Sequence, residues 1–144
     1  MRRGVEVERV WGDGDLVELE WRVSDGTSLV VNRVYVGHEQ LVEAAEALAR
    51  FDDSAGGAEF ELALGKFGPE FANGAFCAHF RYFAPGRLLV TCRQESEFTE
   101  IGAARLASSA TTHLRSERAL LQRFAMELRA LAAGMDVEPW LEAI

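Results

Sequence analysis

The most regular pattern of hydrophobic and polar positions lies near the N-terminus, over residues 16–23. Every second residue in this run is apolar, and the residues between them are charged. Such alternation is typical of a strand with one buried face and one wet face. The apolar positions are Val17, Leu19, Trp21 and Val23, and the charged ones are Glu18, Glu20 and Arg22. We therefore predict a half-buried strand here, preceded by a shorter strand over residues 5–11.

A second apolar run follows over residues 28–36, after the dipeptide Asp25-Gly26. An Asp-Gly pair readily supplies the positive φ angles of a tight hairpin turn. The N-terminal part of the chain, residues 1–36, therefore predicts strands that include a hairpin.

After Gly37 the spacing of the apolar residues changes to three and four, which predicts an amphipathic helix over residues 38–51. The same spacing returns near the end of the chain and predicts a second helix over residues 117–133. Ser116 is the expected N-cap of this helix, and Gly134 is a suitable residue just beyond its end.

The segment between the helices, residues 58–114, has strand character. We predict strands over residues 60–64, 76–83 and 88–98, with Pro85-Gly86 as the centre of a type II turn. A loop is expected over residues 65–74. Residues 101–114 have the least clear pattern, with a last strand expected around residues 108–114.

The order strands, helix, strands, helix, with hairpin-length turns, requires a largely antiparallel sheet. We therefore predict one α+β domain over residues 1–144, with about six or seven strands and both helices packed on one face of the sheet. Residues 135–144 are expected to form a tail that docks back through Trp140. A distant duplication of strands followed by a helix would fit this order, but no residue-level repeat supports it.

Charge limits the classes of partner. The chain has 15 basic and 23 acidic residues, a formal net charge of −8, and its arginines are scattered while Lys66 is its one lysine. A nucleic-acid or anionic-membrane surface needs clustered basic residues, so neither partner is expected. A negative field instead favours association with a basic protein.

The N-terminal residues contain no apolar segment typical of a signal peptide, and no apolar run approaches the ~20 residues that span a bilayer. Cys77 and Cys92 have no recognised metal or redox spacing. We interpret them as reduced cysteines in a cytoplasmic protein. The preference for Arg over Lys and the many alanines suggest a bacterial genome rich in G and C.

One group of residues could carry chemistry. If Pro85-Gly86 forms a two-residue hairpin loop, His79 lies opposite Cys92, and Cys77 lies diagonal to Cys92 on the same face. A Cys-His pair can form a thiolate nucleophile, and these residue types also bind zinc. The same face would carry Phe83, Leu88 and Val90, however, so we favour the interpretation that these residues belong to the core.

Nucleotide-binding and hydrolase motifs are missing from the sequence, and we expect no metal and no cofactor. If the protein nevertheless binds a small molecule, we expect a pocket between a curved sheet and the C-terminal helix. Its polar groups would be Cys77, His79, Arg81 and Cys92.

Partner-binding residues are expected among large aromatic residues outside the clear core pattern. These are Trp11, Phe67, Phe71 and Trp140. An exposed strand edge would also allow a homodimer by sheet extension.

The stretch from Leu120 to Gly134, LLQRFAMELRALAAG, follows a strand-rich body. In this order of elements the chain resembles small bacterial immunity-type proteins of toxin systems. The resemblance implies no catalytic residues. Our leading hypothesis is a non-enzymatic protein-binding domain with an immunity or adaptor-like role, and the alternative is a small-molecule-binding domain or enzyme.

Overall fold

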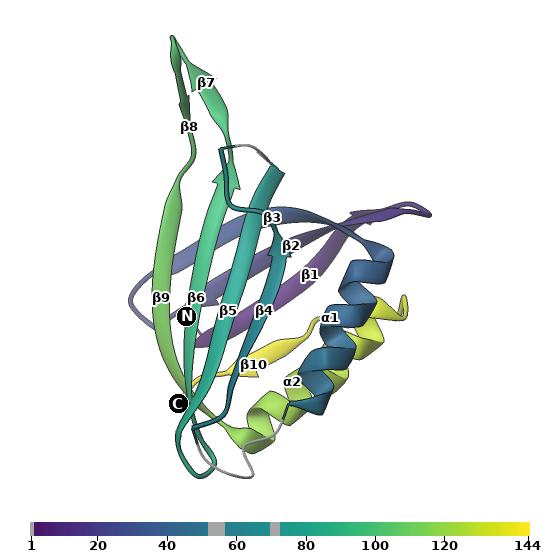
Figure 1. Ribbon diagram of the computed structural model, residues 1–144, viewed down its shortest axis with the longest axis vertical. Helices are drawn as coiled ribbons and strands as arrows, with labels where there is room; N and C mark the ends of the chain where they lie inside the picture. Colours follow the sequence, from purple (N-terminus) through teal and green to yellow (C-terminus); the bar gives the residue numbers. More distant parts are fainter. Residues whose placement is uncertain (1, 52–56, 70–72) are drawn as a thin grey trace.

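The computed structural model describes residues 2–51, 57–69 and 73–144, in which two helices and ten strands form an α+β fold (Figure 1). All strand pairs are antiparallel, and the helices pack with the sheets, which confirms the expected class. The strands divide between two four-stranded sheets and one two-stranded hairpin. The count exceeds the expected six or seven because three of the strands have only three residues each.

The first sheet, called here the N-terminal sheet, has the strand order β10-β1-β2-β3. Its strands are β1 (Gly4–Gly12), β2 (Leu16–Ser24), β3 (Leu29–Gly37) and β10 (Trp140–Glu142). The predicted hairpin is confirmed as β2 and β3, which are joined by residues 25–28, and Gly26 has a φ of 91°. The alternating apolar residues of β2 are fully buried, as expected.

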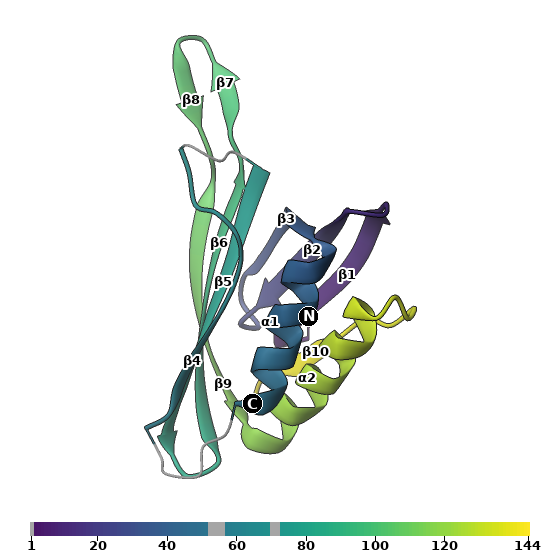
Figure 2. The same cartoon turned by 45° about the vertical axis from the view of Figure 1, so that its right-hand side comes forward.

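The second sheet, called here the central sheet, has the strand order β4-β5-β6-β9. Its strands are β4 (Glu59–Gly65), β5 (Asn73–Ala84), β6 (Arg87–Glu97) and β9 (Ser109–Glu117). Between β6 and β9 the chain forms β7 (Thr99–Ile101) and β8 (Ala104–Leu106), a hairpin that projects beyond the body (Figures 1 and 2).

The helices are α1 (His38–Arg50) and α2 (Arg118–Ala132), and they pack side by side next to β4 and below β1 (Figure 2). Neither is long and apolar enough to cross a membrane. The expected N-cap of α2 is wrong: β9 continues through Ser116, Glu117 is the N-cap, and the Ser116 hydroxyl instead donates a hydrogen bond to the carbonyl of Glu142 at 2.7 Å. Gly134, with a φ of 91°, follows the helix end as predicted.

Each four-stranded sheet is an antiparallel meander followed by a helix. In the central sheet, β4, β5, β6 and β9 lead into α2, and in the N-terminal sheet β1, β2 and β3 lead into α1. The fourth strand of the N-terminal sheet, β10, comes from the tail and pairs with β1. The predicted docking of the tail is thus confirmed, and Leu141 is the tail residue that enters the core.

A single hydrophobic core lies between the two sheets and the helices. Trp21 from β2 stacks on Phe76 from β5 with ring centroids 3.7 Å apart, which joins the two sheets through fully buried aromatic surface. Phe80 and Tyr82 lie on the same face of β5 as Phe76 and are also buried. They are core residues and not an exposed stacking platform.

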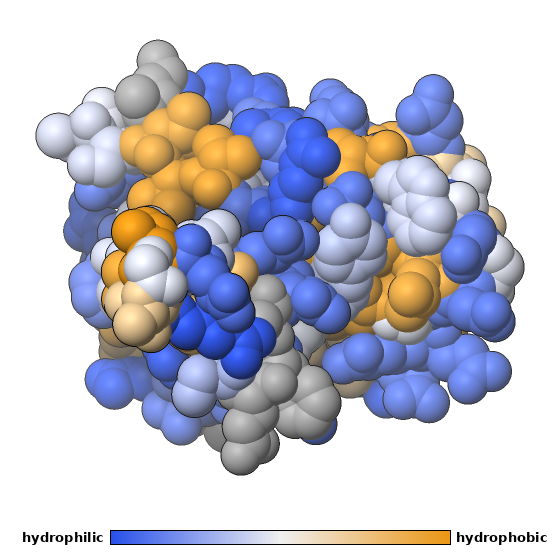
Figure 3. Space-filling view, turned by 90° about the horizontal axis from the view of Figure 1, so that it is seen from above, coloured by the Kyte–Doolittle hydropathy of each residue, from blue (hydrophilic) through white to orange (hydrophobic). Residues whose placement is uncertain are grey.

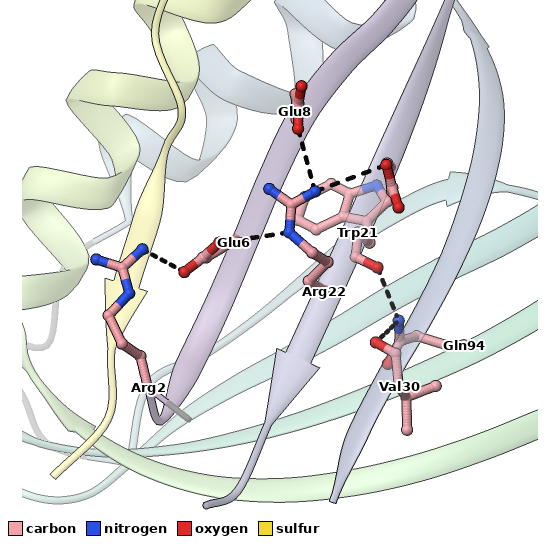
Figure 4. A network of polar contacts seen from close by, with 8 residues as sticks. Arg2, Glu6, Glu8, Trp21, Arg22, Val30 and Gln94 are labelled. Carbon is pink, nitrogen blue, oxygen red and sulfur yellow. Dashed lines mark hydrogen bonds and ion pairs between the residues drawn. The ribbon is translucent and has the colours of Figure 1, made fainter.

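Two buried amides connect the sheets where β3 crosses β5 and β6. The Gln94 amide donates to the Val30 carbonyl at 3.1 Å (Figure 4). It also donates to the Asn32 side-chain oxygen at 2.9 Å. The Asn32 amide donates to the carbonyls of Ala75 at 2.9 Å and Glu95 at 3.1 Å. Because buried polar groups are costly without partners, these bonds hold β3 at one position on the central sheet.

The same crossing brings two backbones into direct contact. Gly74 in β5 has a φ of 88°, and a Cβ there would overlap the carbonyl oxygen of Arg33 in β3. A side chain at this position would therefore both strain the backbone and push the sheets apart.

The buried amides give a first prediction. Replacing Asn32 by Ala leaves Gln94 and two carbonyls with fewer partners, so the free energy of unfolding should fall by about 2–4 kcal/mol. Urea denaturation measures this loss. Asn73→Ala, at an exposed position of β5, is the matched control and should change stability by less than about 0.5 kcal/mol. Equal stability of the two variants would contradict the role given to the amides.

The close approach gives a second prediction. Gly74→Ala should lower the midpoint of thermal unfolding, with a loss of about 2 kcal/mol or more, since it combines left-handed backbone with steric overlap. Gly14→Ala should be nearly neutral because nothing lies within 4 Å of a Cβ built at Gly14. Thermal unfolding of the two variants followed by circular dichroism would show the difference.

Candidate protein-binding surfaces

The expected pairing of His79 with Cys92 is wrong by one residue. Ala84 does lie opposite Arg87, but the register shifts at Phe83, and Tyr82 pairs with Leu88. The shift is a β-bulge, which moves the residues of β5 that precede Phe83 by one position relative to β6.

As a result, the candidate residues divide between the two faces of the central sheet. Cys92 pairs with Ala78 and lies in the core, whereas His79 pairs with Thr91 on the outer face. Cys77 and Arg81 share the outer face with His79. Both cysteines are buried, as expected, but only Cys92 belongs to the core between the sheets, and no Cys-His-Cys group is assembled.

The environment of the two thiols suppresses ionisation. Burial raises the pKa of Cys92 to about 12. Burial and a hydrogen bond to the Glu61 carboxylate, at 3.0 Å, raise the pKa of Cys77 to about 12 as well. Both are therefore protonated near neutral pH, which is unsuited to a thiolate nucleophile. Within residues 2–51, 57–69 and 73–144, no three His, Cys, Asp or Glu side chains lie close enough to hold a metal ion.

The place expected for a small-molecule pocket holds a hollow of about 260 Å³ between the helices and β5. Its lining comes mainly from α1 and α2 with Phe51 and Tyr82, and it includes none of Cys77, His79, Arg81 and Cys92. The polar groups proposed for that pocket are therefore not brought together in it.

Strand pairing gathers arginines that are scattered in the sequence. Arg81 in β5, Arg87 and Arg93 in β6, and Arg115 in β9 all lie on the outer face of the central sheet and are exposed. Arg81 and Arg115 flank Leu89 in one row across three strands, and His79 and His113 flank Thr91 in the next row. We call this surface the arginine face. The sequence shows these residues but not their clustering. The arginines come from three strands, β5, β6 and β9, and only strand pairing brings them side by side.

A larger hollow, of about 620 Å³, lies at the end of the arginine face near the turn between β5 and β6. Arg87 and Arg115 line it together with Phe83 and Ile144, both about half exposed. Glu117 also lines the hollow, which therefore combines two guanidinium groups, one carboxylate and apolar surface.

The expected aromatic anchors lie in separate places. Trp11 is 47% exposed and packs edge-on against Tyr35, with ring centroids 6.4 Å apart. Phe67 is half-buried, and the Arg93 guanidinium lies over its ring at 4.3 Å. Phe71 lies outside the described residues.

Trp140 is a packing residue of the docked tail. It is half-buried, and the guanidinium groups of Arg2 and Arg123 lie over its ring at 3.9 and 5.8 Å. Its ring nitrogen is buried and has no hydrogen-bond partner among the described residues. Of the expected anchors that the structure describes, Trp11 alone exposes a large part of its surface.

The projecting hairpin of β7 and β8 was not predicted as such. Ile101 pairs with Ala104, and Thr99 pairs with Leu106. Directly paired residues share a face, so Ile101, Ala104 and Leu106 form an apolar face of the hairpin. Ile101 is 65% exposed and Leu106 is 51% exposed, so this face is open to solvent.

The opposite face of the hairpin carries the charged pair Glu100 and Arg105. The turn between the strands has Gly102 at its first central position with a φ of 63°. A Gly-X pair between two short β-compatible runs is the sequence signal that could have revealed this hairpin. Figure 3 looks onto the end of the molecule that bears the hairpin and shows hydrophobic surface there in groups separated by hydrophilic side chains.

The outer face of the N-terminal sheet differs from the arginine face because its charges are paired. Arg22 contacts Glu6, Glu8 and Glu20 at 3.4, 3.1 and 3.6 Å, and Arg2 also reaches Glu6 (Figure 4). Arg33 lies within 4 Å of Glu18 and Glu20. Four glutamates of this sheet, Glu6, Glu8, Glu18 and Glu20, thus form ion pairs with arginines.

No protein-family model, curated protein sequence or solved structure matches this chain. The functional argument therefore depends on the chain's own surfaces.

The thiols give a third prediction. Iodoacetamide at pH 8 should modify Cys77 and Cys92 slowly in the folded protein and quickly in urea, since the pKa of each is about 12 when folded against 9.0 ordinarily. Glu61→Gln removes a negative charge beside Cys77 and should speed its modification without changing that of Cys92. Glu59→Gln is the control. Mass spectrometry of the modified peptides measures both rates, and equal rates for Cys77 in all three proteins would contradict the assignment to Glu61.

Proposed function

We propose that this chain is a non-enzymatic protein-binding domain with an adaptor-like or immunity-like role, anchored to its partner by the apolar face of the β7–β8 hairpin. The observation that carries the proposal is the exposure of Ile101 and Leu106 on one face of a hairpin that extends away from the body (Figures 1 and 2). Large aliphatic side chains on an unsupported hairpin stabilise nothing in the isolated chain.

Physical considerations favour a partner that covers the hairpin. A two-stranded hairpin alone is only marginally stable in water, so binding would stabilise it. Full burial of a Leu or Ile side chain contributes about 1.5–3 kcal/mol, and Ile101 and Leu106 are more than half exposed. The outer edges of β7 and β8 also carry backbone groups that a partner strand can pair with.

The net charge of the chain supports a partner of positive sign. A formal charge of −8 accelerates association with a basic protein. We therefore propose a basic protein with an apolar groove as the partner of the hairpin. A second copy of the chain, paired through the hairpin edges, is the alternative to be separated by measuring the native mass.

The fourth prediction concerns the hairpin. The double variant Ile101→Asp/Leu106→Asp should weaken capture of the partner by tenfold or more, about the effect expected for losing a central apolar anchor. Its thermal midpoint should stay close to that of the wild type because both side chains are exposed. Quantitative pull-down from a lysate of the source organism, using the tagged full chain, measures the capture.

Met126→Asp is the matched control, since Met126 is 68% exposed and lies on α2, far along the chain from the hairpin. It should leave capture unchanged. Equal capture by the hairpin variant and the wild type would refute the anchor role. Native mass spectrometry that shows a dimer for the wild type and a monomer for the hairpin variant would identify the partner as a second copy.

A further inference from the structure

The arginine face carries exposed guanidinium groups, although Glu59 and Glu117 lie directly opposite Arg81 and Arg87 in the strand register. Arg22, on the other sheet, contacts three glutamates, but within residues 2–51, 57–69 and 73–144 no ion pair joins Arg81, Arg87 or Arg115 to a carboxylate. The central sheet turns this face away from the core, and its arginines are exposed. A chain with a net charge of −8 therefore gathers exposed arginines on one part of this sheet.

The 620 Å³ hollow adds a second, different feature to the same surface. Arg87 and Arg115 stand at the hollow, and Phe83 and Ile144 supply apolar lining. Guanidinium groups bind carboxylates through two parallel hydrogen bonds, and an apolar hollow between them suits a large hydrophobic side chain. The two features together describe a ligand that is acidic and has an apolar residue within it.

We propose that the arginine face binds an acidic protein segment, whose carboxylates meet Arg81, Arg87 and Arg115 and whose large apolar side chain enters the hollow. This inference goes beyond the proposed function, because it concerns a second surface on the other end of the central sheet from the hairpin. With both surfaces occupied, the domain would bridge a partner at the hairpin and an acidic segment at the arginine face.

Charge argues against the other occupants. Glu59 and Glu61 line the β4 edge of this face, and Glu117 lies opposite Arg87 in the strand register. The positive area is therefore too short for the phosphate track of a nucleic acid. A second copy of the chain has its densest glutamates on the N-terminal sheet, where Arg22 and Arg33 already hold them. A short acidic segment needs only the small area around Arg81, Arg87 and Arg115, so it can avoid the glutamates at the β4 edge.

The fifth prediction tests this surface with defined probes. A fluorescein-labelled peptide of about twelve residues, rich in Glu and Asp with one central Phe, should bind the full chain at low ionic strength and bind more weakly as salt screens the charges. Fluorescence anisotropy measures the affinity. The variant Arg87→Glu/Arg115→Glu should bind the peptide at least about tenfold more weakly. This loss is expected when two exposed ion pairs are removed and repulsion is added.

Two matched proteins separate this site from other effects. Arg50→Glu makes the same change at an exposed position on α1 and should leave the affinity unchanged. Ile101→Asp/Leu106→Asp should also bind the peptide normally, so failure of the hairpin proposal and failure of this one are distinguishable. Circular dichroism confirms that each variant is folded.

Two matched probes define the ligand. The same peptide with Ser in place of Phe should bind more weakly, and a single-stranded DNA of equal charge should bind more weakly than the peptide. Equal affinity of the wild type and Arg87→Glu/Arg115→Glu would overturn the proposal. Tighter binding of the DNA would overturn the choice of a protein segment, and equal binding of the Ser peptide would overturn the role of the hollow.

Discussion

The hydrogen bonds between Asn32 and Gln94 fix how the two sheets of this protein meet. Both amides are buried, and together they reach carbonyls in β3, β5 and β6. The amide groups donate these bonds at the crossing where the glycine backbone of β5 passes the carbonyl of Arg33, while the Gln94 side-chain oxygen has no partner among the described residues. The stack of Trp21 on Phe76 fills the space beside this crossing. The Asn32–Gln94 pair thus determines where the two sheets cross, and burial of the apolar core contributes most of the free energy of folding.

This crossing determines which surfaces are available. One face of each sheet is used in the shared core, and the helices close the remaining side. The other face of each sheet is left to solvent, and the two outer faces differ in their charge state. On the N-terminal sheet the glutamates are paired with arginines, whereas on the central sheet the arginines lack such pairs among the described residues. The chain therefore presents one outer face with paired charges and another whose arginines have no ion pair among the described residues.

Local patterns were sufficient to predict much of the fold. The alternation in β2, the Asp25-Gly26 turn and the spacing of apolar residues in α1 and α2 each depend on a few neighbouring residues, and the structure confirms them. The bulge at Phe83 depends on how β5 fits the rest of the core, and no local pattern marks it. The register shift of one residue places Cys92 and His79 on opposite faces of the sheet, so they cannot form the candidate catalytic group. The clustering of Arg81, Arg87 and Arg115 likewise follows from strand pairing, so counting arginines along the chain could not reveal it.

The position of β10 also has a consequence for the order in which the protein is built. During synthesis β1 emerges long before β10, and its outer edge is covered only when Trp140–Glu142 has left the ribosome. The central sheet, by contrast, contains only strands that are consecutive apart from the projecting hairpin, and it can form as soon as β9 is available. The nascent chain therefore carries an open strand edge until residues 140–142 have been made, and β10 then protects this edge from pairing with other chains.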